Sequence, residues 1–214
     1  MTAIHDWHAL DPDDVVFVAM DFQNDFAHPD GTYGRNGFPH VPEAAATILP
    51  SVIHAWQAAR AHRIPVVAVG LTILEDLEGN AIGIEQFRPA LRALFSREGF
   101  RAGTWGQELL EELPAHDYYV RKWGHSAMYL TDLEKILRAL GRRVLVMSGL
   151  GTNGVVEGTA RDAVTRGFDV AVLTDAVCAP DQQLHEGAMR SLGHLGRLLT
   201  TEEFVGILST HGRG

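Results

Sequence analysis

Two charged residues stand where apolar segments end and could do acid-base chemistry together. Asp21 follows the apolar run 15–20 in VFVAMDFQNDF, and Lys122 closes an apolar and aromatic run in YYVRKWGHSAM. A carboxyl group in a partly dry crevice can give or take protons, and an ammonium group beside it can stabilise negative charge or help to shuttle a proton. Each residue also has a simpler explanation, since Asp21 could cap a turn and Lys122 could be solvated at a strand end.

A glycine-rich segment supplies a third element of this chemistry. The sequence MSGLGTNGVVEGTARDA at 147–163 indicates the end of a buried strand, a bend and the start of a helix. Backbone amides that converge at a helix N-terminus can hold an oxyanion or a carboxylate, so Leu150 and Gly151 are expected to bind substrate. An α/β enzyme would normally carry its nucleophile in this bend, at the position of Gly154, which has no side chain. Close packing alone could also explain such a bend.

Further side chains near these segments are candidates for contacts with a small planar or carboxylated ligand. Aromatic rings could form walls, an amide or imidazole could hydrogen-bond, and an arginine could hold a carboxylate. The expected substrate-binding side chains are Gln23, Phe26, Arg101, Trp105, Trp123 and His125.

The elements that must position these residues follow from the hydrophobic pattern. Continuous apolar runs are typical of strands covered on both faces. They occupy residues 15–20, 65–71, 118–120, 144–147 and 170–173, with a weaker sixth run at 197–199. Helical patterns lie between them, at 44–61, at 130–140, and from a cap at Thr152 or Asn153 to Arg166.

Strands that alternate with helices form βαβ crossovers, so the sequence predicts a three-layer, doubly wound α/β fold with a mainly parallel six-stranded sheet. Ligands bind beyond the carboxyl ends of such strands, which is where Asp21, Lys122 and residues 148–154 are expected. The one long irregular stretch, residues 73–83, could be a lid, a contact with a partner or a plain surface loop.

Composition limits the classes of function. A chain of 214 residues fits one domain, 1–214, and a net charge of -9 without a Lys/Arg cluster argues against nucleic acid and anionic membranes as partners. Cys178 is the one cysteine, which excludes an intrachain disulfide and fits a reducing cytoplasm. The N-terminal MTAIHDWHALDPDD lacks the apolar run of a signal peptide, and no segment approaches the roughly 20 apolar residues that span a bilayer. A cytoplasmic location is therefore expected.

Together the three segments resemble the isochorismatase-like superfamily, often called cysteine hydrolases, over residues 15–204. The family pattern has an aspartate in D-x-Q-(N/D)-x-F, a lysine that ends the third strand, and a cysteine in G-x-x-T-N-x-C-V-E-x-T-A-R-D-A. The matching positions are Asp21 in DFQNDF, Lys122 in VRKWGHSAM and Gly154 in GLGTNGVVEGTARDA. The fold implied by the resemblance, a Rossmann-like isochorismatase-like hydrolase fold, agrees with the pattern of strands and helices.

For most members the resemblance implies amide hydrolysis, in which the aspartate takes the thiol proton, the thiolate attacks the carbonyl and the lysine assists. Gly154 cannot form a covalent intermediate, and Cys178, expected after the fifth strand, lies in the wrong segment to replace the thiol. Isochorismatases themselves carry a small residue at this position and cleave an enol ether. A carboxylic acid protonates the methylene carbon and water adds to the oxocarbenium ion, so Asp21 would have to be protonated.

The resemblance also bears on cofactors and partners. Nicotinamidase relatives hold a metal through an Asp-x-His segment after the second strand, but here that segment reads TILEDLEGNAIG, without histidine. No metal and no cofactor are therefore predicted. The resemblance implies a small-molecule substrate and a homodimer or homotetramer, with residues 73–83 as a candidate contact.

The favoured interpretation is a small-molecule hydrolase that works without a covalent intermediate. Asp21 would be the general acid or base, Lys122 its electrostatic partner, and Gly154 would leave room for substrate or water. Two alternatives remain. One is a cysteine-dependent amidohydrolase of the ureidoacrylate, biuret or carbamoyl-amide type that lacks its nucleophile, and the other is a non-catalytic homologue that binds small molecules.

Overall fold

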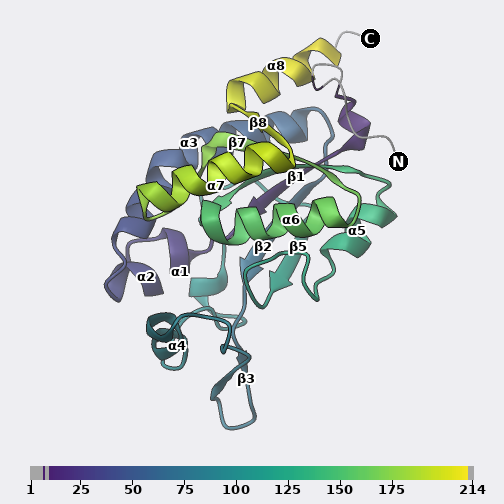
Figure 1. Ribbon diagram of the computed structural model, residues 1–214. Helices are drawn as coiled ribbons and strands as arrows, with labels where there is room; N and C mark the ends of the chain where they lie inside the picture. The colour runs from purple at the N-terminus through teal and green to yellow at the C-terminus, as the bar shows by residue number, and fades with distance from the viewer. Residues whose placement is uncertain (1–6, 8–9, 212–214) are drawn as a thin grey trace.

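The computed structural model describes residue 7 and residues 10–211 (Figure 1). Six parallel strands form one sheet in the order β5-β2-β1-β6-β7-β8, which confirms the predicted fold class. The strands are β1 (Val15–Met20), β2 (Val66–Leu71), β5 (Tyr118–Lys122), β6 (Val144–Leu150), β7 (Asp169–Cys178) and β8 (Arg197–Leu199).

The strand order places a topological switch between β1 and β6. From β1 the chain adds β2 and β5 on one side, and then returns to add β6, β7 and β8 on the other. Crossovers that diverge in this way leave a crevice beyond the carboxyl ends of the two strands. Asp21 follows β1 directly and the glycine-rich bend follows β6, so both stand at this crevice.

β1 is fully buried because each of its faces contacts a separate hydrophobic core. Val15 and Phe17 belong to one core, whereas Val16 and Val18 belong to the other. Side chains of a strand point alternately to opposite faces, so a continuous apolar run fits a strand covered on both sides.

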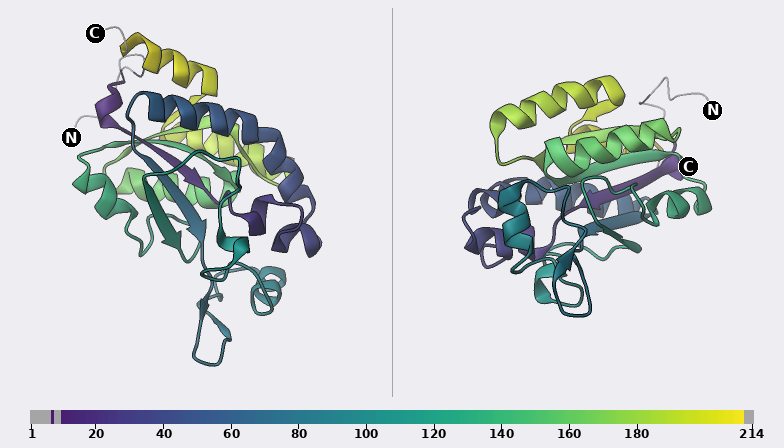
Figure 2. Two further views of the ribbon diagram at one scale, coloured as in Figure 1. Left: turned by 180° about the vertical axis from the view of Figure 1, so that it is seen from behind. Right: turned by 60° about the horizontal axis from the view of Figure 1, so that its bottom comes forward.

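Helices supply these two coverings. On one face, α3 (His40–Ala61) packs beside α8 (Thr201–His211), and the left view of Figure 2 shows α3 in front of the sheet. On the other face lie α5 (Leu133–Ala139), α6 (Glu157–Thr165) and α7 (Gln182–Leu195), which are in front in Figure 1. The remaining short elements are η2 (Pro12–Asp14), α1 (Asn24–Ala27), α2 (Thr32–Arg35), β3 (Leu74–Glu75), β4 (Ala81–Ile82), α4 (Pro89–Phe95), η3 (Trp105–Gln107) and η4 (Thr152–Val156).

The helices predicted at 44–61 and 130–140 are observed at His40–Ala61 and Leu133–Ala139, and two further segments also differ from the predictions. Residues 73–83 are not wholly irregular, because β3 and β4 pair antiparallel and form a hairpin that projects from the body of the molecule (Figure 1). Cys178 was expected after the fifth strand of the sheet but is the last residue of β7, because β7 continues to pair with β6 as far as Leu150.

None of the helices in residues 7 and 10–211 is long and apolar enough to cross a membrane. The N-terminal segment in which no signal peptide was found includes residues 1–6 and 8–9, which lie outside the described residues.

Candidate active site

Asp21 and Lys122 meet as a buried ion pair. Asp21 leaves β1 with its backbone in the left-handed region, at φ 67°, and its amide donates to Val69 O (2.8 Å). Lys122 ends β5, and its Nζ lies 3.0 Å from Asp21 Oδ2. Each residue is 3% exposed. A non-glycine residue in the left-handed region is strained, so the surroundings must hold this turn in place.

Burial controls the protonation of Asp21. Removal from solvent raises the pKa of the Asp21 carboxyl, and the charge of Lys122 lowers it without cancelling that rise. Asp21 Oδ1 has no hydrogen-bond partner among the described residues, whereas Lys122 Nζ also donates to Gly124 O (3.0 Å). The raised pKa brings proton exchange by this buried carboxyl closer to neutral pH.

The bend after β6 is built on Gly151. This glycine has a φ of 95°, which side chains rarely allow, and its amide donates to Cys178 O on β7 (2.8 Å). One π-helical turn, Thr152–Val156, follows, and α6 begins at Glu157. Such turns are uncommon and are frequent at functional sites.

The predicted side-chain cap at Thr152 or Asn153 is wrong. Neither η4 nor α6 has a side-chain hydrogen bond at its cap. The Thr152 hydroxyl is fully buried and lies 2.9 Å from His185 Nδ1 on α7, so it ties the bend to the neighbouring helix.

Gly154 lies within the π-helical turn, and a side chain there would meet open space. Among the described residues, beyond adjacent residues and the turn's own backbone, a Cβ atom built on Gly154 would have only His125 Nδ1 within 4 Å, at 3.9 Å. Gly154 is also absent from the glycines with positive φ. Neither crowding nor backbone conformation therefore requires glycine at this position.

A cavity of about 880 Å³ opens over the ion pair and the bend, a volume suited to a small molecule. The predicted site residues that line it are Asp21, Phe26, Lys122, His125, Leu150, Gly151 and Gly154. The sequence did not indicate several other lining residues, because they come from segments without a motif. These include Tyr33, Phe38, His40, Gln86, Phe87, Arg88, Phe95, Asp181 and Leu184. Asn153, which was expected only as a helix cap, lines the cavity too.

Gln23 and Trp123, which were expected to bind substrate, do not line this cavity. The Gln23 side chain is fully buried and bonds both backbone groups of Leu71, donating to its carbonyl (3.0 Å) and accepting from its amide (2.6 Å). Trp123 donates from Nε1 to Leu130 O (3.2 Å). Both side chains hold the strand ends and loops around the site.

Arg101 and Trp105 also lie outside the lining of this cavity. The Arg101 guanidinium donates to Glu75 Oε1 (2.7 Å) and to two backbone carbonyls, so its hydrogen-bonding capacity is largely used. Trp105 is 49% exposed and packs edge-on against His28. Arg101 is therefore not placed to hold a carboxylate in this cavity, although this role was expected for it.

Arg88 is the guanidinium that does line the cavity. It lies 5.6 Å from the centre of the Phe38 ring and, within the described part of the chain, forms no ion pair and no side-chain hydrogen bond. Burial and the charge of Asp21 raise the pKa of the Tyr33 phenol, with Arg88 opposing the rise, so Tyr33 remains a neutral donor. The sequence FRPALRALF, with an arginine before the N-terminus of α4, is the signal that could have identified Arg88.

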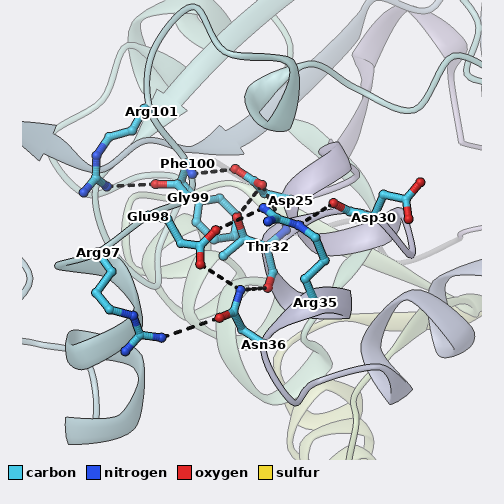
Figure 3. Close-up of polar contacts among 10 residues, drawn as sticks. All are labelled: Asp25, Asp30, Thr32, Arg35, Asn36, Arg97, Glu98, Gly99, Phe100 and Arg101. Carbon is cyan, nitrogen blue, oxygen red and sulfur yellow. Dashed lines mark hydrogen bonds and ion pairs between the residues drawn. The ribbon is translucent and has the colours of Figure 1, made fainter.

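Asp25 connects the segment of Thr32 and Tyr33 to the segment of Phe100 (Figure 3). Its Oδ1 accepts from the amide (3.1 Å) and hydroxyl (2.6 Å) of Thr32, and its Oδ2 accepts from the amide of Phe100 (2.5 Å). The rings of Tyr33 and Phe100 both pack against Phe26, at centroid distances of 4.8 and 4.3 Å. Figure 3 shows the outer contacts of this group, which link Asn36, Arg35, Glu98 and Arg97.

Two further groups bear on the chemistry. Cys178 is half-buried, does not line the cavity, and burial raises the pKa of its thiol to about 12, so it is not an activated nucleophile. Within residues 7 and 10–211, no group of three or more His, Cys, Asp or Glu side chains is arranged to hold a metal ion.

The fold and this site define a class of protein. A doubly wound parallel sheet that holds a buried carboxyl-ammonium pair and a glycine bend at its switch point is the framework of an α/β enzyme acting on small molecules. The chain matches the isochorismatase domain family over residues 15–203, and it belongs to that family. It is therefore an isochorismatase-family hydrolase.

Individual relatives agree with this assignment. The chain is 32% identical over 199 residues to the ureidoacrylate amidohydrolase RutB of Methylorubrum extorquens, covering 86% of this chain and 78% of that protein. Its fold is similar to that of a cysteine hydrolase from Pseudomonas syringae pv. phaseolicola (TM-score 0.76, 23% identity, covering 94% and 95% of the two chains). It is also similar to the N-carbamoylsarcosine amidase of Thermoplasma acidophilum (TM-score 0.68, 27% identity, covering 89% and 98%).

Proposed function

We propose that this protein hydrolyses a small molecule without forming a covalent intermediate. The observation that carries the proposal is the buried Asp21–Lys122 pair, which opens onto the cavity beside Gly154. Asp21 moves protons to or from the substrate, and Lys122 stabilises the charge that Asp21 or the substrate acquires. Gly154 supplies no nucleophile, so the attacking oxygen comes from water.

The substrate is a small carboxylated molecule with a C–N bond of the ureido or amide type. The unpaired Arg88 guanidinium can hold a carboxylate at one side of the cavity, and the aromatic wall of Phe26, Tyr33 and Phe38 can enclose a planar group. The names of the relatives, ureidoacrylate amidohydrolase and N-carbamoylsarcosine amidase, support a C–N bond over an enol ether.

A second candidate is a cysteine-dependent amidohydrolase that lacks its nucleophile. Two observations favour it, the open space for a side chain at Gly154 and the similarity to the amidohydrolase RutB. In that case the bend keeps a shape that serves a cysteine, and the protein as it stands binds its ligand without turnover.

Incubation of the intact protein with ureidoacrylate, biuret, isochorismate and a simple aryl amide, followed by NMR, separates these functions. We expect turnover of ureidoacrylate and much slower turnover of biuret, which lacks the carboxylate for Arg88. Gly154→Cys is expected to fold, because its Cβ atom has room, and to give no faster hydrolysis. Gly154→Ala controls for the added volume.

The opposite pattern supports the second candidate. An intact protein without turnover, combined with hydrolysis by Gly154→Cys but not by Gly154→Ala, would show that the thiol is what the site lacks. Ligand binding without turnover in all three proteins would favour a non-catalytic homologue.

We also propose that the protein acts as a homodimer or homotetramer in the cytoplasm and that the β3–β4 hairpin contacts another copy. Leu77 at its tip is fully exposed, and Leu74 and Ile82 are 43% and 45% exposed, an apolar set that a copy of the chain would cover. Light scattering should give a multiple of 23.4 kDa for the intact protein and a smaller mass for Leu77→Asp. An intact protein of 23.4 kDa would contradict this.

A further inference from the structure

The space beside Gly154 is bordered by the imidazole of His125, a group that can accept or donate a proton. His125 Nδ1 is the one described atom, beyond the chain neighbours and the turn itself, that a side chain at 154 would meet within 4 Å. His125 also lines the cavity that holds Asp21 and Lys122. A water molecule on the His125 side of that volume can therefore hydrogen-bond to an imidazole nitrogen.

The surroundings of His125 hold the ring in place and favour its neutral form. Its ring packs edge-on against Phe87, with centroids 5.4 Å apart, and α6 lies so close that a Cβ atom at Gly158 would be 3.3 Å from His125 O. Partial burial and the charge of Lys122 lower the pKa of His125, and a hydrogen bond with the Gln86 backbone opposes them.

Other titratable groups are less directly placed. Asp21 is paired with Lys122, and the elements in contact with the His125 ring present the neutral Phe87 ring, the Gln86 backbone and Gly154. His40, Arg88 and Asp181 line the same cavity. At neutral pH His125 is therefore ready to accept a proton.

We propose that His125 is the catalytic base that activates water in the space left by the missing side chain of Gly154. The inference rests on the proposed hydrolysis without a covalent intermediate and gives that reaction its second proton-transfer group. Asp21 gives a proton to the leaving group, and His125 takes a proton from the attacking water.

For a ureido or amide substrate, His125 and Asp21 transfer one proton each. His125 takes a proton from water while the water oxygen forms a bond to the carbonyl carbon. Asp21, in its protonated form, gives its proton to the nitrogen as the C–N bond breaks. The products are an acid and an amine, and solvent returns the proton from His125 to Asp21.

His125→Asn tests this assignment, because asparagine keeps a polar atom near the Nδ1 position and does not titrate. With ureidoacrylate as the probe, we expect kcat to fall by about 100-fold or more, KM to change much less, and the acidic limb of the pH-rate profile to disappear. The intact protein should lose activity at low pH because protonated His125 cannot accept a proton from water. His40→Asn, a second histidine in the same cavity, is the matched control and should retain the acidic limb.

A second variant tests whether the attacking water occupies the space beside Gly154. Gly154→Ala fills the space beside His125 Nδ1 with a methyl group and should lower kcat while the titration of His125, followed by NMR of the ring protons, remains visible. Retention of kcat and of the acidic limb by His125→Asn would overturn the assignment and leave the proposed function standing. Absence of turnover by the intact protein would overturn both, and the two failures are therefore distinguishable.

Discussion

Asp21→Asn is expected to lower kcat by about 10²–10⁴-fold, the range typical of a group that transfers protons in the transition state. Asparagine keeps the size of the side chain and can still contact Lys122, but it can neither give nor take a proton. The variant should also lose the alkaline limb of the pH-rate profile. In the intact protein that limb reports loss of the Asp21 proton, at a pKa raised by burial.

A matched control separates this effect from a general loss of carboxylate charge in the cavity. Asp181 lines the same cavity, and its Oδ1 accepts from the Leu184 amide at the start of α7 (2.8 Å). Asparagine caps helices about as well as aspartate, so Asp181→Asn should fold normally and retain the alkaline limb. Comparable kcat values for Asp21→Asn and the intact protein, with circular dichroism unchanged, would remove Asp21 from the mechanism.

Lys122→Met is expected to destabilise the fold by about 3–5 kcal/mol at neutral pH, because it leaves a buried carboxylate without its counter-charge. Asp21 and Lys122 are each 3% exposed, so water cannot replace the lost interaction. Chemical denaturation with a fitted midpoint and slope measures the loss. The double variant Asp21→Asn/Lys122→Met, which removes both charges, should recover a large part of it.

The cost of Lys122→Met should depend on pH in a defined direction. Burial already raises the pKa of Asp21 in the folded protein, and removing Lys122 removes the charge that lowers it. The folded state then holds its proton more tightly than the unfolded state, whose carboxyl has a pKa of about 4. Stability from this group is present below that value and is lost as pH rises through the folded pKa.

We therefore expect Lys122→Met to approach the intact protein in stability near pH 4 and to fall behind it towards neutral pH. Midpoints of denaturation at several pH values provide the comparison. A deficit that is constant across this range would indicate lost packing of the lysine stem and not an uncompensated charge.

Much of the fold could be predicted from the sequence because the central strands β1, β2 and β6 are buried on both faces. Such strands appear as continuous apolar runs, and β1 begins and ends at the predicted residues. The edge strand β8 also matches its predicted range, whereas the other strands differ at their ends. The π-helical turn and the absent cap could not be predicted, because the Thr152 hydroxyl bonds to His185, more than 30 residues away in the chain.

The centre of the candidate site could be predicted for a related reason. The carboxyl ends of parallel strands meet at one edge, so Asp21 and Lys122 come together although one hundred residues separate them. The walls of the cavity could not be predicted in the same way. Arg88, Phe38 and Tyr33 lie in loops and short helices whose positions depend on tertiary contacts. The bonds of Arg101 to Glu75 and to two backbone carbonyls, which use its donors outside the cavity, depend on tertiary contacts in the same way.

The Asp25 contacts support the walls of the cavity and are separate from the contacts that hold the proposed proton-transfer groups. Asp25 ties α2 to the loop at Phe100, and the buried Phe100 ring packs behind Phe26 and Tyr33, two rings of the aromatic wall. The charged pair is anchored separately, at the ends of β1 and β5. Substitutions in the aromatic wall can therefore change which molecule binds while Asp21 and Lys122 keep their positions. Evolution could alter the substrate of such a protein in this way without altering its reaction.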